Sequence, residues 1–529
     1  MFIMVKDFKM FLIRVSLLLF LVTLFFAQST FAQEKKAAGN VEAGKKVYTK
    51  RCIFCHGDNG AGDGVASSRF NPKPRDFTMG LFKYRTTPNG MLPTDDDLLK
   101  VVKNGLPGTG MPHWSDILSE QEQKDVVQYI KTFSPKFERQ KEVIPVVEIG
   151  KEIPSSAESI EKGKALFKSL ECFKCHGNEG RGDGPSALTL ADDKGDSIRP
   201  RNLTLNWHFR GGGEARDIYT RVNTGLNGTP MPSFKDSLDN EKSWHLANYV
   251  RSLSPEKRPE LDGVIKSKKV TGEIPSDPSS PFWSDSEKGG GKELWFPMVG
   301  QVTREPRHFT PTVRDIFVKS VFSEKEIAFL VTWNDPSQSK EGESLPSAGG
   351  AEGEDDLFGG SEEATPVATA LDDAMAIQFP SKKLEGLKKP YFIMGDEKNS
   401  VNLWTWKSGK LGESNANGID KESSQADSDN ALKGSGGYKD GQYRIVIKRS
   451  LATGNKENDV QFEPGKFIPI AFYAWDGHNG EALSKRAISH WYFLLLEPPT
   501  PKDVYIYPPL TALAVLGCCL LIQRKLRKK

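Results

Sequence analysis

The pattern of apolar and polar residues divides the chain into a helical first half and a strand-rich second half. In the first half, apolar residues recur at helical spacing, as where Val126, Val127 and Ile130 share one face. This periodicity predicts helices over residues 40–51, 120–133, 159–169 and 240–253. After Arg258 the apolar residues alternate with polar ones, which predicts strands with one buried face.

The strand-rich half predicts a β-sandwich. The strand candidates are residues 327–333, 443–447, 467–475 and 491–496. A segment rich in Ser, Pro and Gly leads into this region at 276–291. Two polar inserts interrupt it, an acidic one at 341–363 and a second one at 408–437, and both are expected to be surface loops or disordered.

The N-terminus has the features of a secretory signal. Three basic residues precede an apolar run at 15–26, and small residues flank Phe31 at the positions that a signal peptidase reads. We expect residues 1–32 to be a signal peptide, cleaved after Ala32. An uncleaved anchor is the alternative, but the apolar run is short for a membrane span.

A second apolar run, at 504–522, is long enough to cross a bilayer and predicts a transmembrane helix. Pro508 and Pro509 suit a helix start near its outer edge. The five basic residues after Gln523 are expected to stay in the cytoplasm. A buried core helix is the alternative, but nothing follows that could fold around it. The chain should therefore lie on the periplasmic face of the cytoplasmic membrane.

The length and net charge of the chain limit its domain organisation and its possible partners. A chain of 529 residues is too long for one hydrophobic core, so several domains are expected. The net charge is +3, and without the signal segment and the basic tail the exported part carries about −4. This balance excludes a nucleic-acid partner.

Nothing in the sequence resembles a Ser/His/Asp triad, a phosphate-binding loop or a catalytic carboxylate pair. The run Asp95–Asp97 is interpreted as the start of a helix rather than a metal site.

Two cysteine motifs, 120 residues apart, mark an internal repeat. The first is Cys52-Ile53-Phe54-Cys55-His56 and the second is Cys172-Phe173-Lys174-Cys175-His176. Gly-Asp-Gly follows each motif, and Met-Pro, Tyr and Ser-Pro recur at the same offset. Two homologous units explain this register better than chance does. The remaining cysteines, Cys518 and Cys519, lie in the predicted membrane span.

A Cys-x-x-Cys-His motif is typical of covalent c-type haem attachment. The two thiols form thioethers with the porphyrin, and the adjacent histidine is the proximal iron ligand. A thioredoxin-type site or half a zinc site is the alternative, but the first needs a βαβ context and the second needs a nearby cysteine pair. We therefore expect haem c at Cys52, Cys55 and His56, and again at Cys172, Cys175 and His176.

The sixth ligand of each iron is predicted to be a methionine. Met231, within Gly-Thr-Pro-Met-Pro, is the sole methionine between His176 and Pro255, and the repeat places Met111 at the equivalent position. Met79 and Met91 compete in the first unit but have no counterparts in the second. His208 and His245 are the rival ligands in the second unit, and the helical pattern around His245 favours a packing role.

These features resemble class I cytochrome c, over residues 38–137 and 157–257. The resemblance implies two all-α domains whose haem irons have His/Met ligation. The predicted fold class is therefore multidomain: two all-α cytochrome c domains, then an all-β sandwich, then a C-terminal transmembrane helix.

The second half resembles the haem-binding subunit of ethylbenzene dehydrogenase over most of residues 280–498. The resemblance rests on the segments 373–380, 392–396, 401–407, 474–477 and 488–492. That family includes gamma-type haem subunits of periplasmic molybdenum enzymes and of nitrite oxidoreductase. The resemblance implies one noncovalent haem b, held between Met394 and Lys485, with a register uncertain by one residue at the lysine. His478 and His490 are the alternatives, because Arg486 offers no lone pair.

Three functions are compatible with these features. The favoured one is a non-catalytic electron conduit between molybdenum/iron–sulfur subunits, implied by the resemblance, and a soluble cytochrome or membrane respiratory complex. A dihaem peroxidase would need an open iron site, so ligation by Met111 and Met231 distinguishes the two. A sandwich that binds carbohydrate instead of haem b would need exposed aromatic residues such as Trp404 and Trp406.

Overall fold

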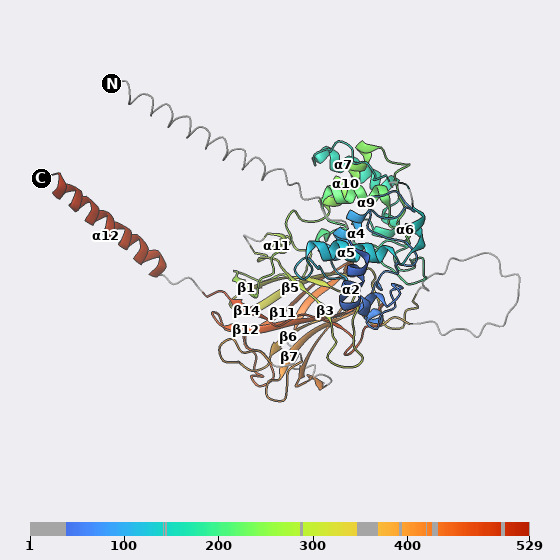
Figure 1. Cartoon of the computed structure of the whole chain (residues 1–529). Coiled ribbons are helices and arrows are strands. Elements are labelled where there is room, and N and C mark those ends of the chain that lie inside the picture. Colours follow the sequence, from blue (N-terminus) through green and yellow to red (C-terminus); the bar gives the residue numbers. More distant parts are fainter. Residues whose placement is uncertain are drawn as a thin grey trace, which may run out of the picture.

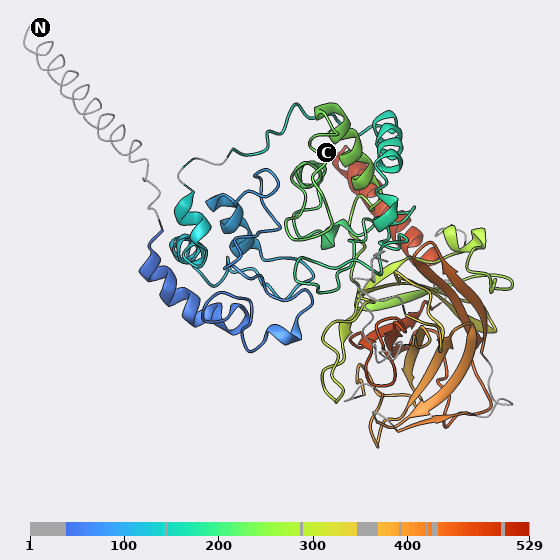
Figure 2. The ribbon, with the colours of Figure 1, turned by 90° about the vertical axis from the view of Figure 1, so that its right-hand side faces the viewer.

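The computed structural model describes residues 39–140, 142, 145–285, 289–345, 369–390, 394–418, 421–425, 432–498 and 503–527. It contains two helical units, a large β-sheet region and a C-terminal helix that extends away from them (Figure 1). A second view shows the helical units side by side, next to the sheet region (Figure 2). The predicted signal peptide at 1–32 lies outside the described residues.

The first helical unit is built around the crossing of its first and fifth helices. Its elements are α2 (Val41–Arg51), α3 (Ile53–His56), η1 (Ser67–Arg69), α4 (Asp95–Asn104), α5 (Glu120–Lys131) and α6 (Pro135–Arg139). A Cβ atom at Gly44 would lie 2.0 Å from the carbonyl oxygen of Asp125, so only glycine lets α2 and α5 approach this closely. Tyr48, Val126 and Ile130 form the buried core around the crossing.

The second helical unit repeats this plan. Its elements are α7 (Ala157–Ser169), α8 (Phe173–His176), η2 (Asn206–His208), α9 (Ala215–Thr224) and α10 (Asn240–Ser252). A Cβ atom at Gly163 would lie 2.0 Å from the carbonyl oxygen of His245, so α7 and α10 also cross at a glycine. Phe167, Trp244 and Tyr249 belong to the buried core of this unit.

The four predicted helices are confirmed as α2, α5, α7 and α10, and α4 and α9 are additional. Asp95–Asp97 lie in the first turn of α4, where carboxylates face the positive end of the helix dipole. The Thr94 hydroxyl accepts a hydrogen bond from the backbone nitrogen of Asp97 at 3.1 Å and caps this helix. The acidic run therefore starts a helix, in agreement with the interpretation above.

The sheet region forms one continuous path of strands. Its elements are β1 (Val264–Lys269), α11 (Pro281–Ser284), β2 (Leu294–Pro297), β3 (Val299–Gly300), β4 (Asp315–Phe322), β5 (Glu326–Asn334), β6 (Ala374–Pro380), β7 (Val401–Lys407), β8 (Lys410–Ala416), β9 (Glu422–Ser424), β10 (Lys433–Lys439), β11 (Gln442–Ser450), β12 (Phe467–Trp475), β13 (Ala487–Ile488) and β14 (Tyr492–Leu496). The main order is β10-β11-β5-β4-β1-β14-β12-β6-β7-β8-β9. β1 pairs in parallel with β14 and β4, and the other described pairs are antiparallel.

The two halves of this path face each other across a hydrophobic core. Phe329 and Trp333 of β5 contact Trp404 and Trp406 of β7, with 6.0 Å between the ring centroids in each pair. β5 and β7 are far apart in the strand order, so the sheet must curve into two layers to bring them together. The other face of β5 is also buried, because Leu330 packs in a second cluster that includes Trp283 of α11.

The polar insert at 408–437 differs from the expectation of a loop or disorder. Its described residues form β8, β9 and part of β10. Ser408 and Gly409 have φ values of 44° and 89°, which turn the chain between β7 and β8. Strands pair through the backbone, so polar side chains at the end of a sheet do not prevent pairing. Most of the acidic insert at 341–363 lies outside the described residues.

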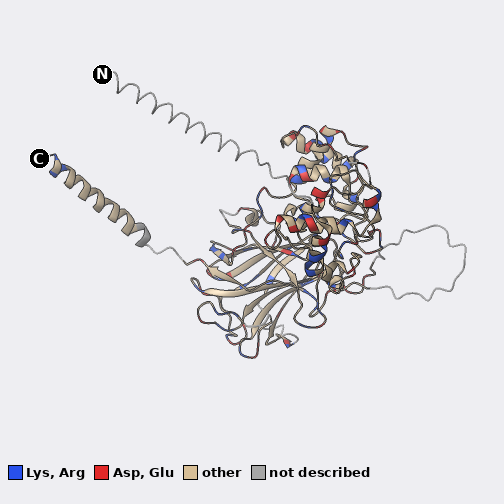
Figure 3. Cartoon of the chain, in the orientation of Figure 1, with Lys and Arg blue, Asp and Glu red and all other residues tan. Residues whose placement is uncertain are grey.

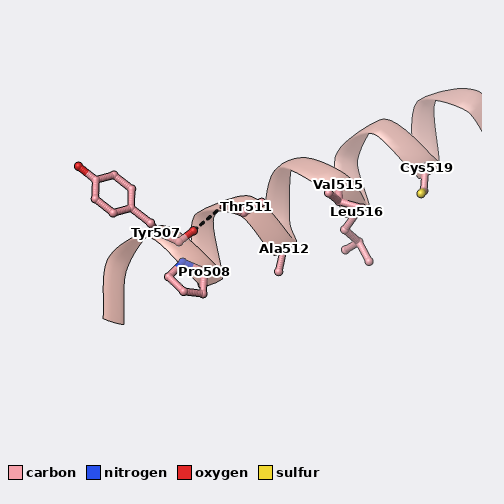
Figure 4. Close-up of a pocket in the computed structure, with 7 residues that line it drawn as sticks. All are labelled: Tyr507, Pro508, Thr511, Ala512, Val515, Leu516 and Cys519. Carbon is pink, nitrogen blue, oxygen red and sulfur yellow. Dashed lines mark hydrogen bonds between the residues drawn. The ribbon is translucent and has the colours of Figure 1, made fainter. Parts of the chain in front are cut away.

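The C-terminal helix α12 (Asp503–Leu526) contains the predicted membrane span. Its stretch Ile506–Leu526 is long and apolar enough to cross a bilayer, and none of it is buried against the rest of the protein. No charged residue occurs between Val504 and Gln523 (Figure 3). Pro508 lies inside the helix rather than at its start, and it shares a shallow apolar face along the helix with Thr511, Val515 and Cys519 (Figure 4).

Candidate functional site

Each helical unit presents two cysteines and a histidine on one helical turn. The backbone nitrogen of His56 donates to the carbonyl oxygen of Cys52 at 2.9 Å, and His176 donates to Cys172 at the same distance. None of the four motif cysteines forms a disulfide. Burial raises the pKa of Cys52 to about 12 and that of Cys172 to about 11. A thioredoxin-type site needs a thiol with a lowered pKa, so this environment disfavours that alternative.

The two histidines are oriented by equivalent backbone contacts. His56 Nδ1 lies 3.1 Å from the carbonyl oxygen of Arg75, and His176 Nδ1 lies 2.9 Å from that of Arg201. A carbonyl can only accept, so Nδ1 carries the proton and Nε2 keeps its lone pair. Burial lowers the pKa of both imidazoles, which favours the neutral form that binds iron. The ring of Phe77 stacks on His56, with 4.5 Å between the centroids.

A glycine-rich loop closes over each turn. Gly57 and Gly177 have φ values of 77° and 76°, which reverse the chain directly after each histidine. The backbone nitrogen of Gly62 then donates to the carbonyl oxygen of His56 at 2.9 Å, and Gly182 donates to His176 at 2.8 Å. The recurring Gly-Asp-Gly sequence therefore holds the histidine backbone in place.

Met111 and Met231 occupy equivalent positions in two matching loops. The backbone nitrogen of Leu106 donates to the carbonyl oxygen of Met111 at 3.0 Å, and Leu226 donates to Met231 at 3.1 Å. In each loop a threonine hydroxyl two residues earlier accepts from the methionine nitrogen, at 3.1 Å and 3.2 Å. The loops are fixed by the same hydrogen bonds, as equivalent axial ligands require. Ligation of iron by these thioethers stays a prediction.

The two histidines of the second unit that are alternative iron ligands to Met231 are hydrogen-bonded to other side chains. His208 Nε2 lies 2.9 Å from both carboxylate oxygens of Asp315 in β4. His245 lies inside α10, and its ring nitrogens contact Ser159 Oγ at 2.8 Å and Glu241 Oε1 at 3.3 Å. The packing role expected for His245 is therefore consistent with its contacts, and Met231 is the remaining candidate.

Basic side chains gather where the two units and the sheet region meet. Burial, followed by the charge of a neighbouring arginine, lowers the pKa of Arg201 to about 10 and that of Lys83 to about 8. The Nε atom of Arg210 and the indole nitrogen of Trp207 are buried and have no hydrogen-bond partner among the described residues. Buried donors of this kind are stabilised by an anion. Haem propionates supply such an anion, so these residues fit haem attached at the nearby motifs.

Buried hydrogen bonds join the two helical units. Arg85 is 1% exposed, and its guanidinium donates to the carbonyl oxygen of Thr224 at 2.7 Å. In the other direction, Arg221 donates to the carbonyl oxygen of Lys83 at 3.0 Å. Asn227 Oδ1 accepts from the backbone nitrogen of Gly90 at 3.0 Å. These contacts hold the two motif-bearing units in a fixed relation.

Met394 is buried in the sheet region in an unusual conformation. Its side chain is 2% exposed, and its φ of 66° lies in the left-handed region that methionine rarely adopts. The backbone nitrogen of Met394 donates to Gln378 Oε1 at 2.9 Å and to the Tyr473 hydroxyl at 3.0 Å. Strained residues often occur at binding sites, so a buried thioether in this conformation fits an axial ligand.

The residues facing Met394 differ from the expected lysine. A guanidinium nitrogen of Arg486 lies 2.6 Å from the Met394 sulfur. The guanidinium group as a whole lies over the rings of Tyr473 and Trp475. Lys485 is directed elsewhere, because its ammonium donates to the carbonyl oxygen of Asn479 at 2.8 Å. The structure therefore brings Arg486, rather than Lys485, against Met394. Of the alternative ligands, His490 is exposed and His478 is half-buried.

The tryptophans considered for carbohydrate binding are part of the core. Trp404 and Trp406 are 0% and 3% exposed, and the Trp404 indole nitrogen donates to Asn402 Oδ1 at 3.0 Å. Their rings cannot stack on a sugar in this arrangement. The carbohydrate-binding interpretation is therefore wrong for these two residues.

Comparison with known families agrees with this domain plan. Residues 39–130 match the family described as cytochrome c oxidase, cbb3-type, subunit III, and residues 160–254 match the cytochrome c family. The chain therefore contains two cytochrome c domains. Residues 292–431 match the ethylbenzene dehydrogenase family, which agrees with the resemblance noted in the sequence.

Curated relatives of this cytochrome share only part of their length with it. A protein of Haloferax mediterranei, named as a respiratory nitrate reductase haem subunit, is 28% identical over 30% of this chain and 55% of its own length. The cbb3-type cytochrome c oxidase subunit CcoP of Azospirillum sp. is 25% identical over 40% of this chain and 61% of its own. The cytochrome thus spans about three fifths or less of these relatives.

Two solved structures are also similar to the cytochrome. A chain of the Kuenenia stuttgartiensis reducing HAO-like protein complex is 46% identical, with 41% of this chain and 97% of that chain covered and a TM-score of 0.39. A family 9 carbohydrate-binding module of Caldicellulosiruptor kristjanssonii is 8% identical, with 45% of this chain and 97% of that chain covered and a TM-score of 0.23.

Sequence reasoning missed two functional features of the cytochrome. The carbonyl groups of Arg75 and Arg201 orient the histidines, and the Pro-Arg pair that occurs at 74–75 and again at 200–201 was the available signal. Gly44 and Gly163 permit the helix crossings, and their equivalent places in the repeat were the available signal. A backbone acceptor leaves no side-chain pattern in a sequence, so only the fold shows which carbonyl a histidine meets.

Proposed function

We propose that this cytochrome is a membrane-anchored periplasmic electron-transfer subunit with two covalent c haems. Cys52 and Cys55 would attach one haem, and Cys172 and Cys175 the other. The observation that carries the proposal is the pair of equivalent turns in which each histidine is anchored through Nδ1 and keeps Nε2 available. Bound haem supplies one-electron chemistry at iron.

The residues proposed as axial ligands leave no position for a substrate. Neutral His56 and His176 would bind the iron through Nε2, and Met111 and Met231 would each supply a second protein ligand. A six-coordinate iron suits outer-sphere electron transfer rather than catalysis. Phe77 and the buried cores exclude water around the histidines, and a low dielectric reduces the reorganisation that accompanies a change of charge.

The contacts between the units support direct exchange of electrons within the chain. The hydrogen bonds of Arg85, Arg221 and Asn227 cross the interface between the units and fix their separation. The sheet region is attached as well, because Arg314 donates to the carbonyl oxygen of Gly108 at 2.6 Å, three residues before Met111. A fixed arrangement removes the need for a diffusing carrier between the two sites.

We infer a respiratory oxidoreductase complex as the setting of this protein. Its relatives bear names of a nitrate reductase haem subunit and of a cbb3-type oxidase subunit, which differ in enzyme but share a role in respiration. The resemblance to gamma-type subunits implies molybdenum/iron–sulfur subunits as partners on one side. A soluble cytochrome or a membrane complex would exchange electrons on the other.

α12 is proposed to anchor the cytochrome in the membrane. An exposed apolar surface of this length is unfavourable in water and favourable in a bilayer. Arg524, Lys525 and Arg527 at its end favour a cytoplasmic C-terminus. The predicted signal peptide at 1–32 would deliver the remainder to the periplasm.

Deletion of residues 507–529 is expected to release the protein into the soluble periplasmic fraction with its covalent haems retained. The reason is that α12 makes no buried contact with the rest of the chain. Cell fractionation with an alkaline wash, followed by haem staining of each fraction, measures the distribution. A variant that loses only the charges of Arg524, Lys525 and Arg527 serves as the control and should stay in the membrane. A membrane-bound deletion variant would contradict the anchor.

Met394 and Lys485 stay the proposed axial pair of a haem b in the sheet region. The buried thioether of Met394 supports this proposal, whereas Lys485 reaches the same place only when Arg486 turns away from the sulfur. A lysine that binds iron must be neutral, and its ordinary pKa of about 10.4 opposes this. The proposed electron path is therefore built on the two c-haem sites alone.

A pyridine haemochrome assay on the purified protein tests the haem complement. We expect two c-type haems per chain that survive acid–acetone extraction, and one haem b that the extraction removes. Met394→Ala should abolish the extractable haem and leave both covalent haems, because the sites lie in separate domains. Lys485→Ala should reduce the extractable haem less, and Met298→Ala is the control, because Met298 is also buried in the sheet region but packs in a different hydrophobic cluster.

Two outcomes would change the assignment. A wild-type protein that yields no extractable haem would leave two haems and make the sheet region a docking module. High-spin electron paramagnetic resonance signals together with peroxide turnover would indicate an open iron site, as in a dihaem peroxidase, and would overturn the electron-transfer assignment.

A further inference from the structure

Three buried aspartates meet at one end of the sheet region, away from both haem motifs in the sequence. Asp335 follows β5, Asp373 precedes β6 and Asp476 follows β12. Their side chains contribute carboxylate oxygens that lie within 4.8 Å of one another. The three residues are 1%, 0% and 3% exposed. Buried carboxylates are rare unless they are paired with a cation or protonated.

The hydrogen bonds of this cluster leave one carboxylate oxygen, Oδ2 of Asp335, without a partner among the described residues. Asp373 accepts from the Ser339 nitrogen at 2.6 Å, the Tyr443 hydroxyl at 2.7 Å and the Gly477 nitrogen at 2.8 Å. Asp335 Oδ1 accepts from the backbone nitrogen of Ser337 at 3.1 Å. Asp335 Oδ2 and the Ser337 hydroxyl are buried and have no partner among the described residues. Asp335 thus brings an oxygen without a hydrogen bond to the cluster, and the second such oxygen belongs to Ser337, whose backbone binds Asp335.

Asp476 is held by the loop that follows it. Its Oδ1 accepts from the backbone nitrogens of His478 at 2.8 Å and Asn479 at 3.2 Å. The nearby carboxylate of Glu481 is paired with His308, whose Nε2 lies 2.9 Å away. Glu481 therefore bonds to His308 and supplies no positive charge to the three aspartates.

The positive charge near the three aspartates does not balance their negative charge. Burial and the neighbouring carboxylates raise the pKa of Asp335 well above its usual range. Burial, followed by the charge of Asp476, raises the pKa of Asp373 to about 7, and burial also raises that of Asp476. Arg199 of the second helical unit approaches Asp476 and Asp335, but its guanidinium donates to the carbonyl oxygen of Ala187 at 3.2 Å. Three adjacent buried carboxylates would therefore be stabilised by a further positive charge.

We propose that Asp335, Asp373 and Asp476 bind a calcium ion. The available ligand atoms are carboxylate oxygens and a hydroxyl, with no sulfur, which is the set that hard divalent cations prefer. Calcium takes roughly six to eight oxygen ligands in a flexible geometry, which suits groups from three separate loops. A proton shared within the cluster would satisfy one oxygen but leave the Ser337 hydroxyl without a partner.

This site would have a structural role. It ties together the loops after β5, before β6 and after β12, which are brought close only by the folded sheet. Arg199 of the second cytochrome c unit is close enough to interact electrostatically with Asp476 and Asp335, so the site borders that unit. The proposal does not depend on the presence of haem b.

Calcium binding can be measured directly on the full-length cytochrome in detergent. The protein is first stripped with a chelator, dialysed, and titrated with calcium at constant ionic strength. We expect about one calcium ion bound per chain and an increase in melting temperature, with a smaller increase for magnesium. Asp335→Asn should weaken calcium binding at least about tenfold. Asp372→Asn is the matched control, because the neighbouring Asp372 bonds instead to Ser408 and Lys407.

Variants that fold poorly would be recognised by their covalent haem content and circular dichroism. Ser337→Ala then serves as a milder test, since it removes one proposed ligand atom and no charge. Retention of calcium by Asp335→Asn at wild-type affinity would overturn the proposal. A wild-type protein that binds no calcium and melts at the same temperature with and without it would show that protons alone neutralise the cluster.

Discussion

A chain that carries both Cys172→Ala and Cys175→Ala is expected to lose about half of its covalent haem. Each cytochrome c unit contains its own attachment turn, so removal of both thiols from one unit leaves the other intact. Haem staining after denaturing electrophoresis measures this loss, because noncovalent haem is removed under those conditions. The iron of the second unit would then be held by His176 and a protein ligand alone, and would be lost on unfolding.

The matched control for this experiment is Cys518→Ala. Cys518 lies in α12 and is exposed, away from any histidine motif. Its replacement should leave haem staining at the wild-type level. The corresponding change in the first unit, Cys52→Ala with Cys55→Ala, should remove the other half. Full staining in both double variants would contradict covalent attachment at these motifs.

Met231→His is expected to lower the reduction potential of one haem by an amount on the order of tenths of a volt. A thioether stabilises ferrous iron better than an imidazole does, so the substituted haem becomes harder to reduce. The iron should stay six-coordinate and low-spin, because histidine can occupy the same position. The near-infrared absorption that marks methionine bound to ferric iron should fall by one haem's share. Potentiometric titration and near-infrared spectroscopy measure the two effects.

Met79→His is the control for this prediction. Met79 is 45% exposed and has no counterpart in the second unit, so its replacement should leave both potentials unchanged. Met111→His should shift the other haem instead, since Met111 and Met231 share the same loop hydrogen bonds. An unaltered near-infrared band in Met231→His would assign the axial position to another residue.

The helices of this cytochrome were well predicted where they form a repeated amphipathic frame. α2, α5, α7 and α10 carry apolar residues at helical spacing, and the repeat doubles the signal. The start of α4 was predicted from Asp95–Asp97 but its extent was not, and Thr94 and Asp97 form a capping box at this start. The polar strands β8 to β10 were missed because they pair through backbone groups that leave little pattern in the side chains.

The candidate sites also include some that the sequence predicts and some that it does not. The attachment motifs at Cys52 and Cys172 can be read directly, because c-type attachment needs residues that are adjacent along the chain. The pairing of Met394 with Arg486 could not be predicted, because the two residues are 92 positions apart and meet through β-sheet packing. A one-residue change of register exchanges Lys485 for Arg486 at that place, and only the tertiary structure selects between them.

The sequence by itself determined that this protein contains two repeated units, each with a Cys-x-x-Cys-His motif, a strand-rich domain and an apolar C-terminal segment. These properties depend on local spacing, on repetition and on composition, all of which are present in the linear chain. Only the tertiary structure decided which carbonyls orient His56 and His176, and that Asp335, Asp373 and Asp476 form one cluster. Those contacts depend on how distant strands and loops pack, and the packing free energy is shared among many residues rather than encoded at any one of them.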